Sequence, residues 1–223
     1  MPYGLVVPKS YDGTKALPLI IGLHGSSTTE TRMMQVGDGA LPRLAEERGF
    51  LVATPLGYRR GGGYGRTRTA SGELDAELLR ISQLSEQDVL NVLNLVRANY
   101  RVDPARIYLM GHSMGGNGTW RLGSKYPEIW AGLSPIAGGS DVAAASKRPL
   151  ANLKPPNTPV YTVHGEADRT SPVENTRSMV AELKQLGVPH EYYEIPGGTH
   201  SDVVGPAIPH IVDFFSQHQR ADK

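Results

Sequence analysis

The chain has 223 residues, and its 23 lysines and arginines nearly balance its 22 aspartates and glutamates, giving a formal net charge of +1. This balance gives no reason to expect nucleic acid or an anionic membrane as a partner. The absence of cysteine excludes disulfides, thiolate catalysis and cysteine metal sites. No run of 18 apolar residues is present, so we predict no membrane insertion, and no secretion leader is recognisable after Met1.

Strand signals and helix signals alternate along the chain. Short apolar runs predict strands at 3–8, 17–23, 50–54, 107–110, 131–136, 160–163 and 190–195. Helical patterns are found at 39–48, 74–80, 85–99, 119–126, 172–186 and 206–217. Ser85 with Asp88 three residues later resembles a capping box, so a separate helix is expected to begin there. The alternation predicts an α/β fold, with a mostly parallel, doubly wound sheet flanked by helices in a single domain over 1–223.

The central motif is the Gly-His-Ser-Met-Gly stretch at residues 111–115, which fits G-x-S-x-G. It lies between a predicted strand and a predicted helix, the context in which this motif forms a sharp corner and exposes the serine hydroxyl. A Cβ at Gly111 or Gly115 would collide with the neighbouring strand or helix. Ser113 is therefore the candidate nucleophile, and it needs a general base.

Seven histidines compete for the role of general base. His200 stands in a glycine-rich loop after the last predicted strand, and we select it. His24 and His164 each precede a glycine at a strand end, a position more typical of a histidine that holds a loop through hydrogen bonds. The remaining histidines lie beside the nucleophile, at the start of a strand or on the last helix, and are His112, His190, His210 and His218. Their scattered spacing predicts no metal site.

The acid that orients the base is expected between the nucleophile and the histidine in the chain. Asp168, in the loop after the strand at 160–163, is the favoured candidate because its carboxylate can hold the imidazole tautomer and stabilise the imidazolium. Glu166 is the main competitor, and Asp141 and Asp202 are weaker ones.

An oxyanion needs two N–H donors. The amide of Met114, directly after the nucleophile, is one candidate, and the second is expected from the loop after the strand at 17–23. Ser26 is our choice in that loop, and Ser27 is the alternative.

The segment 56–84 is rich in glycine and arginine, and its arginine loop at 59–68, which follows the predicted strand at 50–54, is expected to lie near the rim of the site. Its arginines could favour an acidic substrate, or they could form a solvated basic loop balanced by nearby carboxylates. The candidate substrate-binding residues are Ser27, Tyr58, Tyr64 and Arg66.

Together, the His-Gly pair at 24–25, the 111–115 motif, His-Gly-x-x-Asp at 164–168 and His200 resemble the α/β-hydrolase superfamily in order and spacing. The stretch from Asp103 into the motif is similar to esterases of the feruloyl-esterase-like, polyhydroxybutyrate-depolymerase-like and predicted-peptidase group. The resemblance implies an α/β-hydrolase fold with no large cap domain and no cofactor. It also implies ester hydrolysis through an acyl-enzyme.

The implied substrate is a small-molecule ester or an ester-decorated polysaccharide or polyester, with short-chain or aromatic acyl groups. Two alternatives stay open. One is a serine peptidase or amidase that uses the same three residues, and the other is a non-catalytic binding protein on a hydrolase scaffold.

Overall fold

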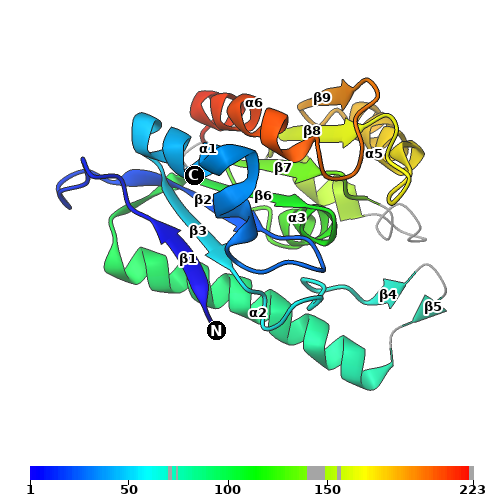
Figure 1. Cartoon of the computed structure of the whole chain (residues 1–223), viewed down its shortest axis with the longest axis horizontal. Helices are drawn as coiled ribbons and strands as arrows, with labels where there is room; N and C mark the ends of the chain where they lie inside the picture. The colour runs from blue at the N-terminus through cyan, green and yellow to red at the C-terminus, as the bar shows by residue number, and fades with distance from the viewer. Residues whose placement is uncertain (70–71, 74, 140–148, 155–156, 221–223) are drawn as a thin grey trace.

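A computed structural model describes residues 1–69, 72–73, 75–139, 149–154 and 157–220 (Figure 1). Within them, seven strands form one sheet in the order β1-β3-β2-β6-β7-β8-β9. These strands are β1 Tyr3–Val6, β2 Leu17–Leu23, β3 Leu51–Pro55, β6 Val102–His112, β7 Gly132–Ile136, β8 Val160–Gly165 and β9 His190–Ile195. β1 runs antiparallel to β3, and the other pairings are parallel. The predicted mostly parallel sheet is confirmed.

Helices cover both faces of this sheet (Figure 1). They are α1 Arg32–Arg48, α2 Ala76–Asn99, α3 Met114–Lys125, α5 Val173–Leu186 and α6 Val204–Gln217, with a short 3₁₀ helix, η1, at Pro149–Leu153. One apolar core lies between the sheet, α1 and α6, and includes Ile20 and Val52. The other lies between the sheet, α2, α3 and α5, and includes Ile21 and Leu109. Neighbouring residues of β2 thus point into opposite cores, as a sheet covered on both faces requires.

Helix α1 begins earlier than expected, at Arg32, and its backbone leaves the helical conformation at residues 36–39. The predicted helix at 39–48 is therefore only its second part. Gly37 has φ of +61°, and a Cβ there would lie 2.9 Å from the Cα atom of Gly205 in α6. The break lets the two helix backbones approach closely, a contact that requires glycine.

The predicted boundary at Ser85 is wrong. Helix α2 runs without interruption from Ala76 to Asn99, and Asp75 is its N-cap, accepting a hydrogen bond from the backbone N–H of Leu78 at 2.8 Å. Ser85 is a buried interior residue whose hydroxyl accepts from the N–H of Tyr64 at 3.1 Å. The side chain of Ser85, which fits the sequence pattern of a helix cap, instead binds the loop that contains Tyr64.

The same side of α2 anchors the glycine- and arginine-rich loop. The carboxylate of Asp88 accepts hydrogen bonds from the N–H groups of Gly57, at 2.9 Å, and Tyr58, at 3.1 Å. The N–H of Gly65 donates to the carbonyl of Ser82 at 3.0 Å. Residues 57–66 are thereby held against α2. Beyond them, a two-stranded sheet joins β4 Arg68–Thr69 to β5 Gly72–Glu73.

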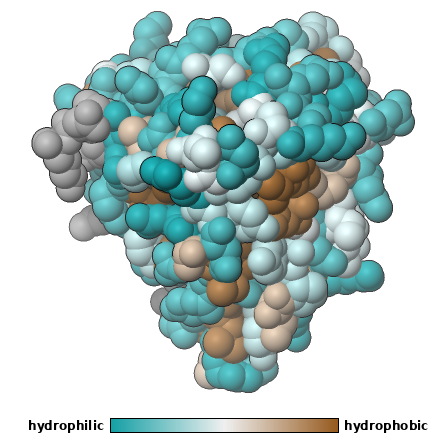
Figure 2. All heavy atoms as spheres, turned by 90° about the vertical axis from the view of Figure 1, so that its left-hand side faces the viewer, coloured by the Kyte–Doolittle hydropathy of each residue, from teal (hydrophilic) through white to brown (hydrophobic). Residues whose placement is uncertain are grey.

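The segment 137–156 contains η1, and its parts at 140–148 and 155–156, including the candidate acid Asp141, lie outside the described residues. Across the described ranges, every helix is too short or too polar to cross a bilayer. The face on the β1 side exposes mainly hydrophilic residues with small hydrophobic areas between them (Figure 2).

Candidate active site

Ser113 occupies a strained corner between β6 and α3. Its φ is +57° and its ψ is −114°, a conformation that residues with a side chain rarely adopt. Its N–H donates to the carbonyl of Ile136 at 2.9 Å, which ties the corner to β7. A Cβ on Gly115 would lie 2.3 Å from the carbonyl oxygen of Leu23, so β2 passes too close for any other residue. The predicted corner is confirmed.

Three residues from separate loops meet at this corner. The hydroxyl of Ser113 lies 2.8 Å from Nε2 of His200, and Nδ1 of His200 lies 2.7 Å from Oδ2 of Asp168. Because a carboxylate only accepts, Nδ1 carries the proton and Nε2 is free to accept from the hydroxyl. The three residues follow β6, β8 and β9, whose carboxyl ends share one edge of the sheet, where sites gather in open α/β sheets.

The competing carboxylates have other partners. Glu166 is exposed and accepts from the N–H of Gly197 at 3.0 Å, and Asp202 accepts from the N–H and the hydroxyl of Thr199, both at 2.7 Å. Both hold the loop that carries His200. Of the acids within the described residues, the structure therefore brings Asp168 to the histidine.

The surroundings of Asp168 favour the ionised form of its carboxyl group. Burial raises the pKa of its carboxyl group, but hydrogen bonds from the N–H of Ser171, from His200 and from the N–H of Thr170 outweigh burial and hold the pKa below its usual value. The two amides donate to Oδ1 at 2.9 and 2.8 Å. An ionised acid at this position can hold the imidazole tautomer and stabilise an imidazolium.

His112 supports the loop of His200, a role that sequence reasoning missed. The two rings lie 4.9 Å apart between centroids, and Nε2 of His112 donates to the backbone carbonyl of His200 at 2.7 Å. Burial is the main reason that the pKa of His112 falls to about 4, so the ring is neutral and can serve as a fixed donor. The one feature of the sequence that could have indicated this role was the position of His112 in the motif, directly before Ser113.

This depressed pKa predicts an acid-sensitive fold. Between pH about 6.5 and pH about 4 the unfolded chain binds a proton on residue 112 that the folded chain does not, so stability falls as the pH falls. The contribution of His112 to the loss between pH 7 and pH 4.5 is about 2–3 kcal/mol. His112→Gln removes the titration while its amide can still donate to His200. Urea unfolding at both pH values should show a smaller loss in the variant, and an equal loss would contradict the prediction.

A cavity of about 230 Å³ opens at Ser113. Its lining residues are Ser26, Gly61, Arg66, Ser113, Met114, Asn117 and Arg121. Met114 is the first residue of α3, so its N–H has no acceptor within the helix. The structure thus brings both candidate oxyanion residues, Ser26 and Met114, to the cavity that borders the hydroxyl.

Three predicted substrate-binding residues do not line this cavity. Tyr64 is fully buried, with its ring 5.9 Å from that of His24, and it lies in the α2-side core. Its prediction as a substrate contact is wrong, because its ring fills the space beneath the loop. Among the described residues, neither Ser27 nor Tyr58 lines the cavity either, and Tyr58 meets α2 through its backbone.

Arg66, in contrast, does line the cavity. The Nε atom of Arg66 is buried, and among the described residues it has no hydrogen-bond partner. Arg121, beside it, donates to the carbonyls of Gly63, at 2.6 Å, and Tyr64, at 3.2 Å. None of the described lining residues is acidic. Arg59 and Arg60 are exposed and lie outside the lining.

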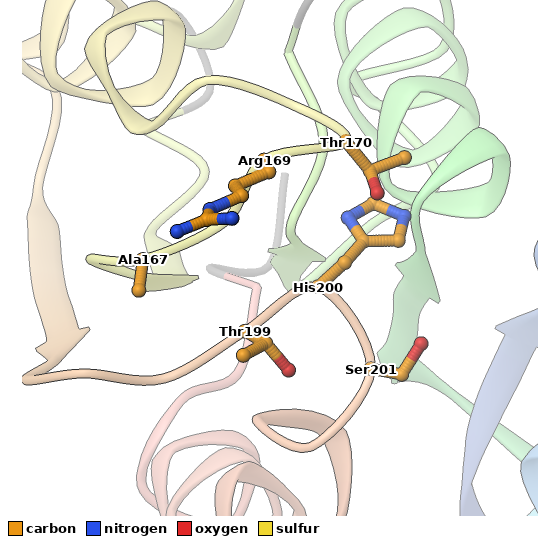
Figure 3. Close-up of a pocket in the computed structure, with 6 residues that line it drawn as sticks. All are labelled: Ala167, Arg169, Thr170, Thr199, His200 and Ser201. Carbon is orange, nitrogen blue, oxygen red and sulfur yellow. The ribbon is translucent and has the colours of Figure 1, made fainter.

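A second, open groove of about 450 Å³ borders His200 (Figure 3). Its lining residues are Ala167, Arg169, Thr170, Thr199, His200 and Ser201. Figure 3 shows the side chains of Thr170 and Ser201 on opposite sides of the His200 ring, whereas Arg169 points away from it. His200 therefore faces this groove as well as the hydroxyl of Ser113.

Comparison with known proteins identifies a family and several relatives of this chain. The profile of the Dienelactone hydrolase family matches residues 38–208. Poly(3-hydroxyalkanoate) depolymerase C of Paucimonas lemoignei is 28% identical over 129 residues, which are 58% of this chain and 30% of that protein. A bifunctional acetylxylan esterase/xylanase of Neocallimastix patriciarum is 31% identical over 153 residues, 68% of this chain and 19% of that protein. The chain thus spans less than a third of the length of either relative.

Solved structures share the fold. A thermostable esterase superposes with a TM-score of 0.74 and 26% identity, over 98% of this chain and 59% of that chain. An S-formylglutathione hydrolase from Agrobacterium tumefaciens superposes with a TM-score of 0.75 and 17% identity, over 96% and 88% of the two chains. The α/β-hydrolase fold without a large cap, expected from the sequence, is confirmed.

Proposed function

This chain belongs to the dienelactone hydrolase family, and we propose that it hydrolyses carboxylic esters through a covalent acyl-enzyme on Ser113. The observation that carries the proposal is the continuous hydrogen-bonded series from the hydroxyl of Ser113 through His200 to Asp168. A serine hydroxyl becomes a competent nucleophile when a base accepts its proton and a third group orients that base. The cavity beside the hydroxyl supplies room for the acyl group.

In the first half-reaction, the oxygen of Ser113 attacks the acyl carbon while Nε2 of His200 takes its proton. The N–H groups of Ser26 and Met114 stabilise the tetrahedral oxyanion. When the bond to the leaving oxygen breaks, His200 returns the proton to the departing alcohol. Water then attacks the acyl-enzyme with His200 again as base, which releases the acid and restores the serine.

The cavity at Ser113 and the groove at His200 suit the two halves of an ester, the acyl group and the alcohol. The acyl group belongs in the cavity with the oxyanion donors, and the leaving alcohol belongs on the side of His200 that protonates it, along the open polar groove. An open groove suits a bulky alcohol, as in an ester-decorated polysaccharide or a polyester. Among the relatives, the depolymerase and the acetylxylan esterase carry such substrates in their names, and a feruloyl esterase B names an aromatic acyl group.

Hydrolysis of p-nitrophenyl acetate, p-nitrophenyl butyrate and methyl ferulate, beside the matched p-nitroanilides, tests the proposal. We expect ester turnover well above anilide turnover, and an added acyl mass on Ser113 after acid quench. Faster anilide hydrolysis would favour an amidase or peptidase. Inertness toward both classes, with retained ligand binding, would leave only the non-catalytic alternative.

Arg66 supports a narrower choice of substrate, an ester whose acyl group carries a carboxylate. A guanidinium whose buried Nε has no partner among the described residues gains a charge-assisted hydrogen bond when an anionic group enters the cavity. The four-carbon acyl groups of p-nitrophenyl hemisuccinate and p-nitrophenyl butyrate differ mainly in that charge. Wild type should prefer the hemisuccinate.

Arg66→Met should lower kcat/KM for the hemisuccinate by about 10–100-fold and for the butyrate by no more than about threefold. Arg59→Met is the matched control, because Arg59 is exposed and outside the lining. An equal loss on both esters would mean that Arg66 shapes the cavity and does not recognise charge.

A further inference from the structure

Asp168 has a second imidazole partner besides His200. His164, in β8, is fully buried, and its Nε2 lies 3.1 Å from Oδ2 of Asp168. The same Nε2 lies 2.9 Å from the carbonyl oxygen of Ser171. Both oxygens only accept hydrogen bonds, so Nε2 of His164 carries a proton, and it donates this proton to the carbonyl of Ser171.

The far side of the His164 ring is fixed by two other elements. Its Nδ1 lies 2.7 Å from the hydroxyl of Thr176 in α5. That hydroxyl donates to the carbonyl of Gly138, directly after β7, at 2.7 Å. Gly138 in turn packs on the start of α3, since a Cβ there would lie 2.5 Å from the carbonyl carbon of Gly116. The ring is therefore oriented by contacts that do not involve the acid.

Three hydrogen-bond donors and the nearby N–H of His164 surround the carboxylate of Asp168. Oδ1 accepts from the N–H groups of Thr170 and Ser171, Oδ2 accepts from His200, and Nε2 of His164 lies 3.1 Å from Oδ2. Of these groups, only His200 must move its proton during the proposed reaction.

We propose that His164 is a positioning residue: its Nε2–H holds the carbonyl of Ser171, and so the turn whose N–H groups fix the carboxylate of Asp168 where it can orient His200. The inference rests on the proposed function for its kinetic effect but not for its geometry. Without this donor, the carbonyl of Ser171 loses its partner, and a shift of the turn rotates the carboxylate and moves the acceptor away from Nδ1. Misplacement of a catalytic group by about 1 Å costs on the order of 10²-fold in rate.

Two substitutions at one position separate positioning from packing. His164→Leu keeps an apolar volume but removes the donor, whereas the amide nitrogen of His164→Gln can occupy the place of Nε2. For p-nitrophenyl butyrate we expect kcat to fall about 10–100-fold in the leucine variant with KM changed less than about threefold. The glutamine variant should recover most of the loss.

Proton NMR supplies a readout that needs no turnover. The proton on Nδ1 of His200 should give a far-downfield resonance in wild type and in His164→Gln, and this resonance should shift upfield or vanish in His164→Leu. Thr176→Val, which removes the hydroxyl that orients the ring, should show a smaller change in the same direction if the leucine variant does not fold. Equal kcat in the leucine and glutamine variants, or an unchanged resonance in folded leucine or valine variants, would overturn the proposal. An inactive wild type that still shows these shifts would sink the esterase function alone.

Discussion

Ser113→Ala is expected to lower kcat for p-nitrophenyl esters by about 10⁴–10⁶-fold, the largest effect that we predict. The variant has no oxygen to attack the acyl carbon, and His200 then has no hydroxyl at 2.8 Å to deprotonate. Residual hydrolysis should come only from substrate binding and the oxyanion donors. The measurement is kcat with an active-site mass assay, in which wild type gains the acyl mass and the variant does not.

The control must show that the backbone corner at residue 113 stays folded in the variant. Thermal unfolding of Ser113→Ala should match wild type within a few degrees, because alanine and serine are similar in size at a position whose φ is +57°. Ser10→Ala, on the exposed surface, should leave turnover unchanged. Retention of more than a tenth of the wild-type kcat in pure Ser113→Ala would rule out this serine as the nucleophile.

Asp168→Asn should lower kcat by about 10³–10⁴-fold, the second largest effect. Aspartate accepts from three donors here, two amides on Oδ1 and His200 on Oδ2, whereas asparagine must turn its NH₂ group toward one of these two sides. If the NH₂ faces His200, Nδ1 becomes the acceptor and the ring proton moves to Nε2, where it blocks proton transfer from Ser113. If it faces the amides of Thr170 and Ser171, the loop itself is destabilised.

Glu166→Gln is the matched control for this prediction. Glu166 lies on the same loop, but its carboxylate accepts from Gly197 and does not contact His200. Its loss should cost kcat only a few-fold. A larger loss in Glu166→Gln than in Asp168→Asn would make Glu166 the orienting acid.

Much of the fold could be predicted from local sequence. The apolar runs of the parallel strands and the helix ended by Gly187 were predictable because burial on both faces and a left-handed helix end each restrict the residue types allowed. The corner at Ser113 was predictable for a similar reason. Gly115 faces the Leu23 carbonyl at a distance that excludes any side chain, and such a requirement is written into the sequence as glycine.

Contacts between distant segments were not predictable in the same way. Ser85 carries the sequence signature of a helix cap, yet its hydroxyl accepts from Tyr64, 21 residues away. Tyr64 looked like a wall of the substrate site because it lies in a polar loop, but that loop turns the ring into the core. A hydroxyl or an aromatic ring can interact with whichever group the fold places beside it, and the residue type alone does not predict that group.

The sequence by itself determined the nucleophile candidate, the order of the three polar residues and the loops that carry them, because strand ends and glycine positions follow local steric rules. Only the tertiary structure showed that Asp168, and not Glu166, contacts His200. It also showed that His112 and His164 lie behind the site and that Arg66 lies beside Ser113. Those choices depend on where separate loops meet within about 3 Å, and that distance is set by the packing of the whole sheet and its helices.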